Sequence, residues 1–453
     1  MSRRPIRFGG PARGTSRRQP ATPEIDQLQI ERLSHEGRGI AKAAGKTVFV
    51  TGALPGERVR ARQLADRSRY MEAETLEVLE ASPDRIEPGC RHYRQCGGCD
   101  LQHLQPEKQI VFKQEQALDQ LRRLGNLVPD AIETPLVSLP WHYRRSARIG
   151  INQLQRNGEA IVGFRRRGSN KLLPIERCEV LDSRAQTLFT ALAEALGEID
   201  EAKSITHAQV QYGDTCGALT LRIKKALGQK ALQRLRRCAE TLDLQLYTET
   251  DTGIVFAGDG EPAALHYSLP AFDAELEFAP GDFLQVNADL NRQMVSRALD
   301  WLAPTAEDRV LDLFCGLGNF TLPLARHSAE VVGVEGSAAM VGRASENARR
   351  NGLENVRVYR QDLSQDFRHQ GWYKGGFDLI LLDPPRTGAR EAVEQLTRYR
   401  ARRVLYVACN PAALARDGAE LATAGYRLSR FCVMDMFPHT AHVEALALFE
   451  LDT

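Results

Sequence analysis

The C-terminal part of this 453-residue chain alternates short apolar segments with segments of helical periodicity. The apolar segments are strand-like and cover 309–314, 330–334, 356–360, 377–382 and 404–408. Helical patterns lie between them at 337–351 and 391–399. Strands that alternate with helices form a parallel, doubly wound sheet. Two last strand patterns, 426–434 and 443–451, are typical of an antiparallel hairpin at the edge of such a sheet.

Polar or glycine-rich residues follow these strand patterns, at the edge where open α/β sheets place their chemistry. Gly316 and Gly318 follow the first pattern, and Glu335 ends the second. A glycine-rich turn with an acid about 20 residues later binds an adenosine-bearing cofactor, and the acid accepts the ribose hydroxyls. The turn lacks the third glycine of a pyrophosphate-binding loop, although a dinucleotide remains an open alternative.

The third and fourth strand patterns favour S-adenosyl-L-methionine as this cofactor. Asp362 follows the third pattern, where an acid suits the adenine amino group. The fourth pattern ends on Asp383-Pro384-Pro385-Arg386, which resembles the substrate-facing loop of nucleic-acid methyltransferases.

The fifth strand pattern ends on Cys409, which Asn410 and a proline follow. A lone strand cysteine is usually a small buried hydrophobe, but a thiol at this edge can attack carbon 6 of a uracil. The attack makes carbon 5 nucleophilic towards a methyl group, and a base must then remove the carbon 5 proton. We predict Glu444 as that base, with His439 and His442 as alternatives that are first interpreted as structural histidines.

The overall charge restricts where RNA could bind. Sixty basic and 58 acidic residues give a net charge of only +2, so a nucleic-acid surface requires local clustering. There is neither an apolar run of about 18 residues nor a secretory signal, and nine cysteines in such a chain indicate thiol or metal chemistry. We therefore expect a cytoplasmic, monomeric protein.

The N-terminal residues differ in composition from the rest. Residues 1–22 are rich in arginine and predict a disordered arm, either RNA-contacting or merely solubilising. Residues 23–82 contain short alternating segments separated by glycine turns, which predict a small β-barrel of oligonucleotide-binding type. The segments expected to be strands are 27–33, 47–51, 57–63 and 71–80. A barrel that only spaces other domains is the alternative.

Four cysteines form a predicted metal site: Cys90, Cys96, Cys99 and the more distant Cys178. Their spacing fits either zinc or an iron–sulfur cluster and does not separate the two. Four thiolates leave no open iron for a substrate, so we expect a structural or RNA-positioning role.

The region between these cysteines and the doubly wound sheet has a mixed α and β pattern. An amphipathic helix is predicted at about 106–124. Two arginine clusters, within 144–148 and 165–167, follow aromatic residues, as phosphate contact and base stacking require. A basic helix at 228–237 is interpreted as a solvated face.

Three motifs carry a resemblance to a known family. They are Asp383-Pro384-Pro385-Arg386-x-Gly388, Tyr406-x-x-Cys409-Asn410 and Asp435-x-Phe437-Pro438-x-Thr440-x-His442-x-Glu444. With them, the chain from about residue 23 to its end resembles the large-subunit ribosomal RNA (uracil-5-)-methyltransferases of the RlmD (RumA) type, within the TrmA-like family. Ala408 and Ala413 stand where that family often has Ser and Thr.

The resemblance implies a multidomain α/β protein. Its parts would be the arm (1–22), a TRAM β-barrel (23–82), a central α+β domain (83–270) and a Rossmann-like class I methyltransferase domain (271–453). The helix at about 106–124 could pack on the methyltransferase domain. The resemblance also assigns a [4Fe–4S] cluster to Cys90, Cys96, Cys99 and Cys178.

The same resemblance implies roles for single residues. Cys409 would be the nucleophile and Glu444 the general base. The S-adenosyl-L-methionine pocket would contain Gln285, Phe314, Asn319, Glu335, Asp362 and Asp383. The implied substrate is a single-stranded or loop uridine of 23S rRNA, uridine 1939 in the branch that has both barrel and cluster. Another rRNA or tRNA uridine, or an RNA-binding role in ribosome assembly, are the alternatives.

Overall fold

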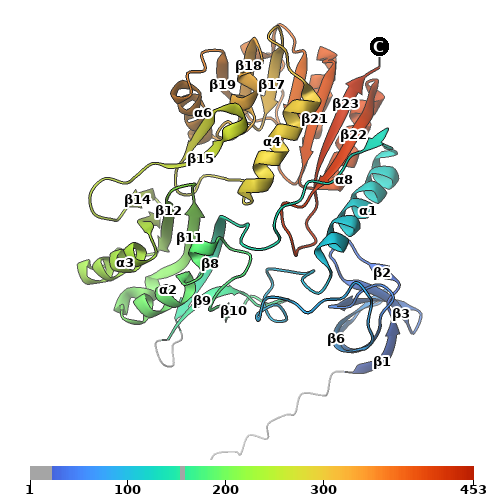
Figure 1. The fold of residues 1–453 in the computed structure, drawn as a ribbon, viewed down its shortest axis with the longest axis vertical. Coiled ribbons are helices and arrows are strands. Elements are labelled where there is room, and N and C mark those ends of the chain that lie inside the picture. The colour runs from blue at the N-terminus through green and yellow to red at the C-terminus, as the bar shows by residue number, and fades with distance from the viewer. Residues whose placement is uncertain (1–22, 154–158, 453) are drawn as a thin grey trace, which may run out of the picture. The chain divides into compact units, whose positions relative to one another are not determined.

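The computed structural model describes residues 23–153 and 159–452 (Figure 1). The described residues divide into two compact units, one of residues 23–34 with Arg38–Pro83 and one of His35–Gly37 with residues 84–452. The basic arm predicted for 1–22 lies outside the described residues. Among the helices of the described ranges, none has the length and apolar character needed to cross a membrane.

The N-terminal unit is one six-stranded sheet with strand order β1-β5-β6-β4-β3-β2. The strands are β1 (Glu24–Gln29), β2 (Arg32–Leu33), β3 (Gly39–Ala43), β4 (Lys46–Thr51), β5 (Arg58–Asp66) and β6 (Tyr70–Glu80). Alternate residues of β4 and β5, such as Val48, Val50 and Val59, are buried in its small core. Strand β3 was not predicted, because glycines flank it and indicate turns.

The middle of the chain forms a seven-stranded sheet with strand order β10-β9-β8-β11-β12-β13-β14. Its strands are β8 (Ser146–Gln153), β9 (Ala160–Arg165), β10 (Leu172–Pro174), β11 (Ile205–Tyr212), β12 (Gly217–Ile223), β13 (Leu244–Thr250) and β14 (Gly253–Phe256). Helices α2 (Leu188–Gly197) and α3 (Gln229–Thr241) bury Phe189 and Leu235 against it. Helix α3 is the predicted basic helix, with one apolar face in the core.

The C-terminal part is an eight-stranded sheet with strand order β19-β18-β17-β20-β21-β23-β22-β7. Its main strands are β17 (Arg309–Leu313), β18 (Glu330–Glu335), β19 (Val356–Arg360), β20 (Leu379–Leu382), β21 (Arg403–Ala408), β22 (Tyr426–Met434) and β23 (Glu444–Leu451). The first five are parallel, and β23 is antiparallel to both β21 and β22. The predicted doubly wound sheet with a terminal hairpin is therefore present.

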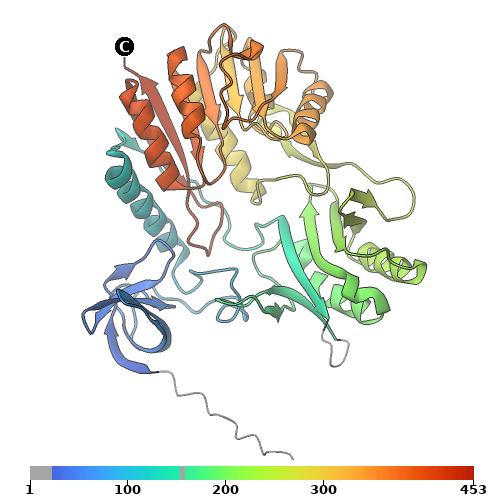
Figure 2. The ribbon, with the colours of Figure 1, turned by 180° about the vertical axis from the view of Figure 1, so that it is seen from behind.

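Helices and a short hairpin accompany this sheet (Figures 1 and 2). They are α4 (Ala288–Leu302), α5 (Thr321–Ala325), α6 (Ala338–Arg350), α7 (Arg390–Leu396) and α8 (Pro411–Thr423), with the hairpin β15 (Leu265–Leu269) and β16 (Ala274–Phe278). Two apolar clusters divide the sheet's side chains between them: Leu405 and Val407 of β21 belong to one, and Val404 and Tyr406 to the other.

Helix α1 (Pro106–Gly125) lies beside α8 and β22, as both views of the ribbon show. A side chain on Gly125 would come within 2.3 Å of the carbonyl oxygen of Ala415, so glycine allows the two helices to approach closely. Strand β7 (Ala131–Ile132) then pairs with β22 at the edge of the large sheet. Helix α1 and strand β7 precede the predicted domain boundary at residue 270, but both pack with the C-terminal sheet. The boundary at residue 270 stays a prediction.

Candidate active site

The loop after β17 has an unusual backbone. Phe314 has a φ of 61°, which is uncommon for a residue with a side chain, and Gly316 and Gly318 have φ values of 56° and 103°. A side chain on Gly318 would lie 2.5 Å from Leu322, whereas one on Gly316 would meet nothing within 4 Å. The backbone at Gly316 is therefore open to a bound group.

Glu335, at the end of β18, is held beside this loop by two backbone groups. Its Oε2 accepts a hydrogen bond from the amide of Gly316 at 3.2 Å, and its Oε1 accepts one from the amide of Ser337 at 2.9 Å. Each carboxylate oxygen keeps a lone pair for a further donor. This arrangement suits the predicted contact of Glu335 with ribose hydroxyls.

Asn319 is fixed by residues that sequence reasoning did not identify. Its amide forms a reciprocal pair with that of Asn291 on α4, with both hydrogen bonds at 2.9 Å. The hydroxyl of Tyr267 donates to Asn319 Oδ1 at 2.9 Å, and Arg145 lies 4.5 Å over the Tyr267 ring. Asn291 is buried in an amphipathic helix. A polar residue on a buried helix face was the sequence signal that could have identified it.

Gln285 and Asp383 come together from different parts of the chain. Gln285 Nε2 donates to Asp383 Oδ2 at 3.5 Å, and the Gln285 carbonyl accepts a hydrogen bond from Arg145 Nε at 2.8 Å. Burial raises the pKa of Asp383 to about 7. Arg145, which was predicted to contact RNA, is buried and instead supports this pair.

Asp362 differs from the other candidate pocket residues because its side chain is exposed. Its Oδ1 accepts hydrogen bonds from the hydroxyl of Ser364 at 2.7 Å and from the Ser364 amide at 3.0 Å. These two bonds lower the pKa of Asp362, so its carboxylate is charged.

Cys409 directly follows β21 and is partly exposed. Asn410 caps α8 by accepting a hydrogen bond from the amide of Ala412 at 3.2 Å, and it donates to the carbonyl of Arg386 at 2.9 Å. The thiol is thereby fixed next to the Asp-Pro-Pro-Arg loop. Burial, and then the carboxyl groups of Glu444 and Asp383, raise the pKa of the Cys409 thiol to about 11.

Glu444 begins β23 and faces the end of β21. Ala408 and Ala445 are partners across the β21–β23 ladder, so Cys409 and Glu444 are the next residues beyond this pair. Glu444 is buried, with 7% of its surface exposed. Burial and the nearby Asp383 raise its pKa to about 8. The strand register thus brings the predicted nucleophile and the predicted base to one place.

The two histidines of the same loop have other partners. His439 is buried, its ring packs against that of Trp141 at a tilt of 35° with centroids 4.0 Å apart, and its backbone amide donates to Gln109 Oε1 at 2.8 Å. Burial lowers the pKa of His439 to about 4. His442 is exposed, and its Nδ1 lies 3.2 Å from Nη2 of Arg386. The packing of His439 favours its interpretation as a structural residue.

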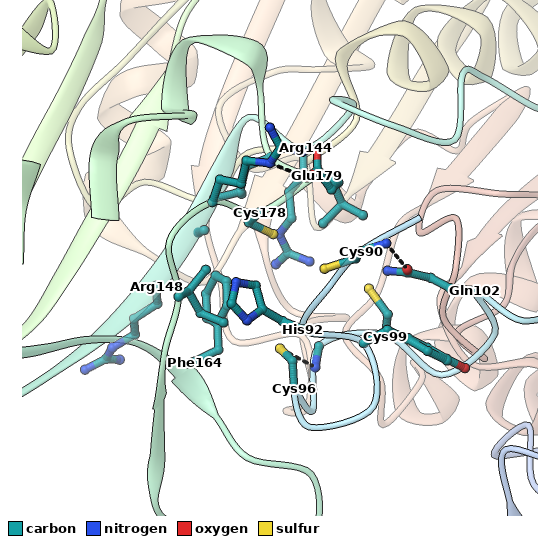
Figure 3. Close-up of a pocket in the computed structure, with 17 residues that line it drawn as sticks. Cys90, His92, Cys96, Cys99, Gln102, Arg144, Arg148, Phe164, Cys178 and Glu179 are labelled. Atoms are coloured by element: carbon teal, nitrogen blue, oxygen red, sulfur yellow. Dashed lines mark hydrogen bonds and ion pairs between the residues drawn. The ribbon is translucent and has the colours of Figure 1, made fainter. Parts of the chain in front are cut away.

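Figure 3 shows the four predicted ligand cysteines around one cavity of about 260 Å³. Cys90, Cys96 and Cys99 come from the loop before α1, and Cys178 comes from the loop after β10. Arg167 braces this loop by donating to the carbonyl oxygens of Cys96 and Cys99.

Burial raises the pKa of all four thiols, to about 12 for Cys99 and about 11 for Cys178. Over the described ranges, no group of three or more His, Cys, Asp or Glu side chains surrounds a single point closely enough to hold a metal ion. The four thiols nevertheless line one and the same cavity.

A second cavity, of about 1360 Å³, lies next to the first. Arg148 and Phe164 contribute to both cavities, and Arg165, Arg166 and Lys171 also line the larger one. Among the described residues, those that line it include no aspartate or glutamate. The predicted basic and aromatic cluster thus forms a positively charged concave surface.

Comparison with known proteins identifies the class of the protein. A model of the tRNA (uracil-5-)-methyltransferase family matches residues 130–451, and a model of the TRAM domain of tRNA (uracil(54)-C(5))-methyltransferase matches residues 27–83. The fold is shared with the tRNA (uracil-54, C5)-methyltransferase of Pyrococcus abyssi, solved with S-adenosyl-L-homocysteine: the TM-score is 0.71 at 22% identity, over 93% of this chain and 100% of that one. The protein is a S-adenosyl-L-methionine-dependent methyltransferase with an N-terminal TRAM domain.

More similar proteins refine this assignment. The chain is 46% identical to the 23S rRNA (uracil(1939)-C(5))-methyltransferase RlmD of Alkalilimnicola ehrlichii, over 96% of this chain and 98% of that protein. It is 47% identical to the RlmD of Pseudomonas aeruginosa strain UCBPP-PA14, over 98% of each chain. The chain belongs to the family of RNA (uracil-5-)-methyltransferases that these proteins represent, and the resemblance drawn from its motifs is confirmed.

Proposed function

We propose that this enzyme methylates carbon 5 of uridine 1939 in 23S rRNA. The observation that carries the proposal is the register of β21 and β23, which places Cys409 opposite Glu444 beside the Asp-Pro-Pro-Arg loop. A thiol and a carboxyl group at one site are the two groups that methylation of a uracil carbon requires. The choice of nucleotide rests on the relatives named RlmD.

The reaction is proposed to proceed through a covalent adduct. Cys409 reacts as its thiolate: the sulfur bonds to carbon 6, and the electrons of the 5,6 double bond move towards carbon 5 and the carbon 4 carbonyl. Bound S-adenosyl-L-methionine would supply an electrophilic methyl group, which carbon 5 takes up, and the cofactor would leave as S-adenosyl-L-homocysteine. Glu444 then removes the proton from carbon 5, the double bond re-forms, and the sulfur leaves carbon 6 as a thiolate.

The cofactor is proposed to lie across the carboxyl ends of β19, β18, β17 and β20. Its pocket would be formed by Gln285, Phe314, Asn319, Glu335, Asp362 and Asp383. The open space at Gly316 and the free lone pairs of Glu335 support this placement. Asp362 is exposed and charged, so it can accept a hydrogen bond from the adenine amino group.

The cavity lined by Cys90, Cys96, Cys99 and Cys178 is proposed to hold a [4Fe–4S] cluster. A zinc ion binds sulfur at about 2.3 Å and would draw four thiolates together around one point. A cluster bonds each thiolate to a different iron, so its ligands stand further apart. The four thiols that line one cavity of about 260 Å³ support the cluster.

The RNA is proposed to reach the site as a loop or single strand, since the target base must leave any stack to meet both Cys409 and Glu444. The TRAM domain and the basic cavity of Arg148, Arg165, Arg166 and Lys171 provide surfaces for the rest of the substrate. The protein is proposed to act as a monomer.

The experiment uses the full chain with methyl-labelled S-adenosyl-L-methionine and three RNAs. These are a 23S rRNA fragment that contains uridine 1939, the same fragment with cytidine at that position, and unmodified tRNA. Label in 5-methyluridine at position 1939 of the first RNA alone is the expected result. Label in tRNA or at another uridine would mean that this RNA or this uridine is the substrate instead. Binding of RNA without incorporation of label would support a role in ribosome assembly.

A further inference from the structure

Helix α1 contacts the loop between β22 and β23, which we call the base loop (residues 435–443) because Glu444 follows it. Lys113 of α1 is fully buried. Its Nζ donates to Asp435 Oδ1 at 2.5 Å and to the carbonyl of Phe437 at 3.0 Å. These two bonds join residues more than 300 positions apart in the sequence. A lysine without access to water needs such partners, because burial disfavours its charged form.

Gln109, one helical turn earlier, holds the other part of the base loop. Its Oε1 accepts a hydrogen bond from the amide of His439 at 2.8 Å, and its Nε2 lies 3.2 Å from the His439 ring nitrogen Nδ1. His439 has a φ of 68°, which is uncommon for a residue with a side chain. The base loop is therefore fixed at its start and near its middle by one face of α1.

The strand register connects Lys113 to Glu444. Met434 and Glu444 are cross-strand partners in β22 and β23, and Asp435 is the residue after Met434. The ion pair of Lys113 and Asp435 therefore lies at the end of the ladder where Glu444 begins β23. Any shift of Asp435 would move the strand end that determines the position of Glu444.

We propose that Lys113 is a positioning residue of the methyltransferase: its buried ion pair holds the base loop, and its positive charge favours the carboxylate form of Glu444. The effect of Lys113 on catalysis rests on the proposed function. The effect of Lys113 on the ionisation of Glu444 concerns two residues of this chain and can be measured without RNA.

The charges around the two residues determine the expected sign. Glu444 is buried and interacts with Asp383, which raises its pKa, and with Lys113 and Arg386, which lower it. Its carboxyl group also interacts with the thiol of Cys409.

Lys113 in turn faces Asp435, Glu444 and Asp100. Removing its charge takes away one of the two cations that favour ionised Glu444. The pKa of Glu444 must then rise above its value of about 8.

The first measurement is an infrared titration of the Glu444 carboxyl group, identified by the loss of its band in Glu444→Gln. Lys113→Met removes the charge and keeps the side-chain length. We expect the midpoint of the band to move upward by about one pH unit. Lys108→Met is the matched control, since Lys108 is an exposed lysine of the same helix paired with Asp84, and it should leave the midpoint unchanged.

Lys113→Met leaves the carboxylate of Asp435 without its partner. The double variant Lys113→Met/Asp435→Asn removes both charges of this ion pair and so avoids an unpaired Asp435. Both variants are first compared with the unchanged protein by circular dichroism. An unchanged Glu444 midpoint in a folded single variant would overturn the proposal. If the single variant does not fold, the double variant decides: its midpoint should still rise, by a smaller amount because the negative charge of Asp435 is also removed, and an unchanged midpoint would overturn the proposal.

Kinetics test the catalytic consequence. In the double variant the pH profile of product release should move upward by the same amount as the carboxyl midpoint, and adduct with RNA should accumulate at neutral pH. If the unchanged protein methylates RNA but the variant shows no such shift, the role of Lys113 is refuted. If the unchanged protein transfers no methyl group, the proposed function fails, while the titration still decides the electrostatic proposal.

Discussion

The hydroxyl of Tyr406 on β21 donates a hydrogen bond to Asp417 Oδ2 on α8, at 2.7 Å. The same oxygen accepts a hydrogen bond from the amide of Ala389, and Arg416 pairs with the other oxygen. Tyr406 and Asp417 are both buried. They join the strand and the helix on either side of Cys409, so the thiol is held by a polar network within the apolar core.

This network predicts a stability effect. Tyr406→Phe removes one hydrogen bond to a buried charged group, which should lower the free energy of unfolding by about 2 kcal/mol. Equilibrium unfolding in urea measures the change. Asp417 keeps its bonds to Ala389 and Arg416, so the variant should still fold. A loss below about 0.5 kcal/mol would mean that the bond contributes little in solution.

The proposed nucleophile predicts a separation of binding from chemistry. Cys409→Ala should abolish methyl transfer and leave the affinity for S-adenosyl-L-methionine nearly unchanged, because the proposed adenosine contacts lie at the ends of β17, β18 and β19. Calorimetry and incorporation of labelled methyl groups measure the two properties. Cys432→Ala, at a buried cysteine within β22, is the control and should retain activity. Comparable turnover by the Cys409 variant would exclude the mechanism.

The proposed base predicts a trapped intermediate. Glu444→Gln keeps the shape of the side chain but cannot accept the carbon 5 proton, so the reaction should stop after methylation and before release. Denaturing electrophoresis with labelled cofactor should show a protein–RNA band that disappears in Glu444→Gln/Cys409→Ala. Normal product release would remove Glu444 from the mechanism and make His442 the next candidate, since His439 is buried with a pKa of about 4.

The cysteine cavity predicts a metal content. Protein purified without oxygen should contain about four irons and four acid-labile sulfides per chain. Cys99→Ser should lose most of the iron, whereas Cys238→Ser, at a buried cysteine of α3, should retain it. Iron and sulfide analysis with an absorption spectrum measures both. A content of one zinc and no iron per chain would refute the cluster and indicate that the four thiols bind a single zinc ion.

The pKa of Glu444 predicts a pH dependence of stability. Its folded pKa of about 8 lies above its ordinary value of 4.5, so the protonated form is favoured in the folded protein. The resulting stabilisation is complete below pH 4.5 and is lost as the pH rises through about 8. Glu444→Gln should therefore gain stability relative to the unchanged protein between pH 5 and pH 9. Urea unfolding at pH 5 and pH 9 measures the free energy of unfolding of both proteins. If the difference between the two proteins is the same at both pH values, the pKa of Glu444 is not raised.

Local patterns predicted much of the C-terminal sheet. The strands Val356–Arg360 and Tyr426–Met434 agree with the predicted bounds, because a run of apolar residues and the polar residue that ends it are both local in sequence. The same reasoning identified Cys409 and Glu335 as strand-end residues. It failed for Gly39–Ala43, because the flanking glycines indicate turns. In the structure this segment forms a strand that pairs with the neighbouring strand Lys46–Thr51.

The sequence by itself determined the alternation of strands and helices in the C-terminal sheet, the polar residues at its strand ends, and the motifs that identify the family. The tertiary structure decided which distant residues meet: Lys113 with Asp435, Asn291 with Asn319, and Arg145 with Gln285. In the sequence these are a lysine, an asparagine and an arginine in otherwise ordinary segments. Their partners depend on strand register and helix packing, which arise only when the whole chain buries its apolar surface.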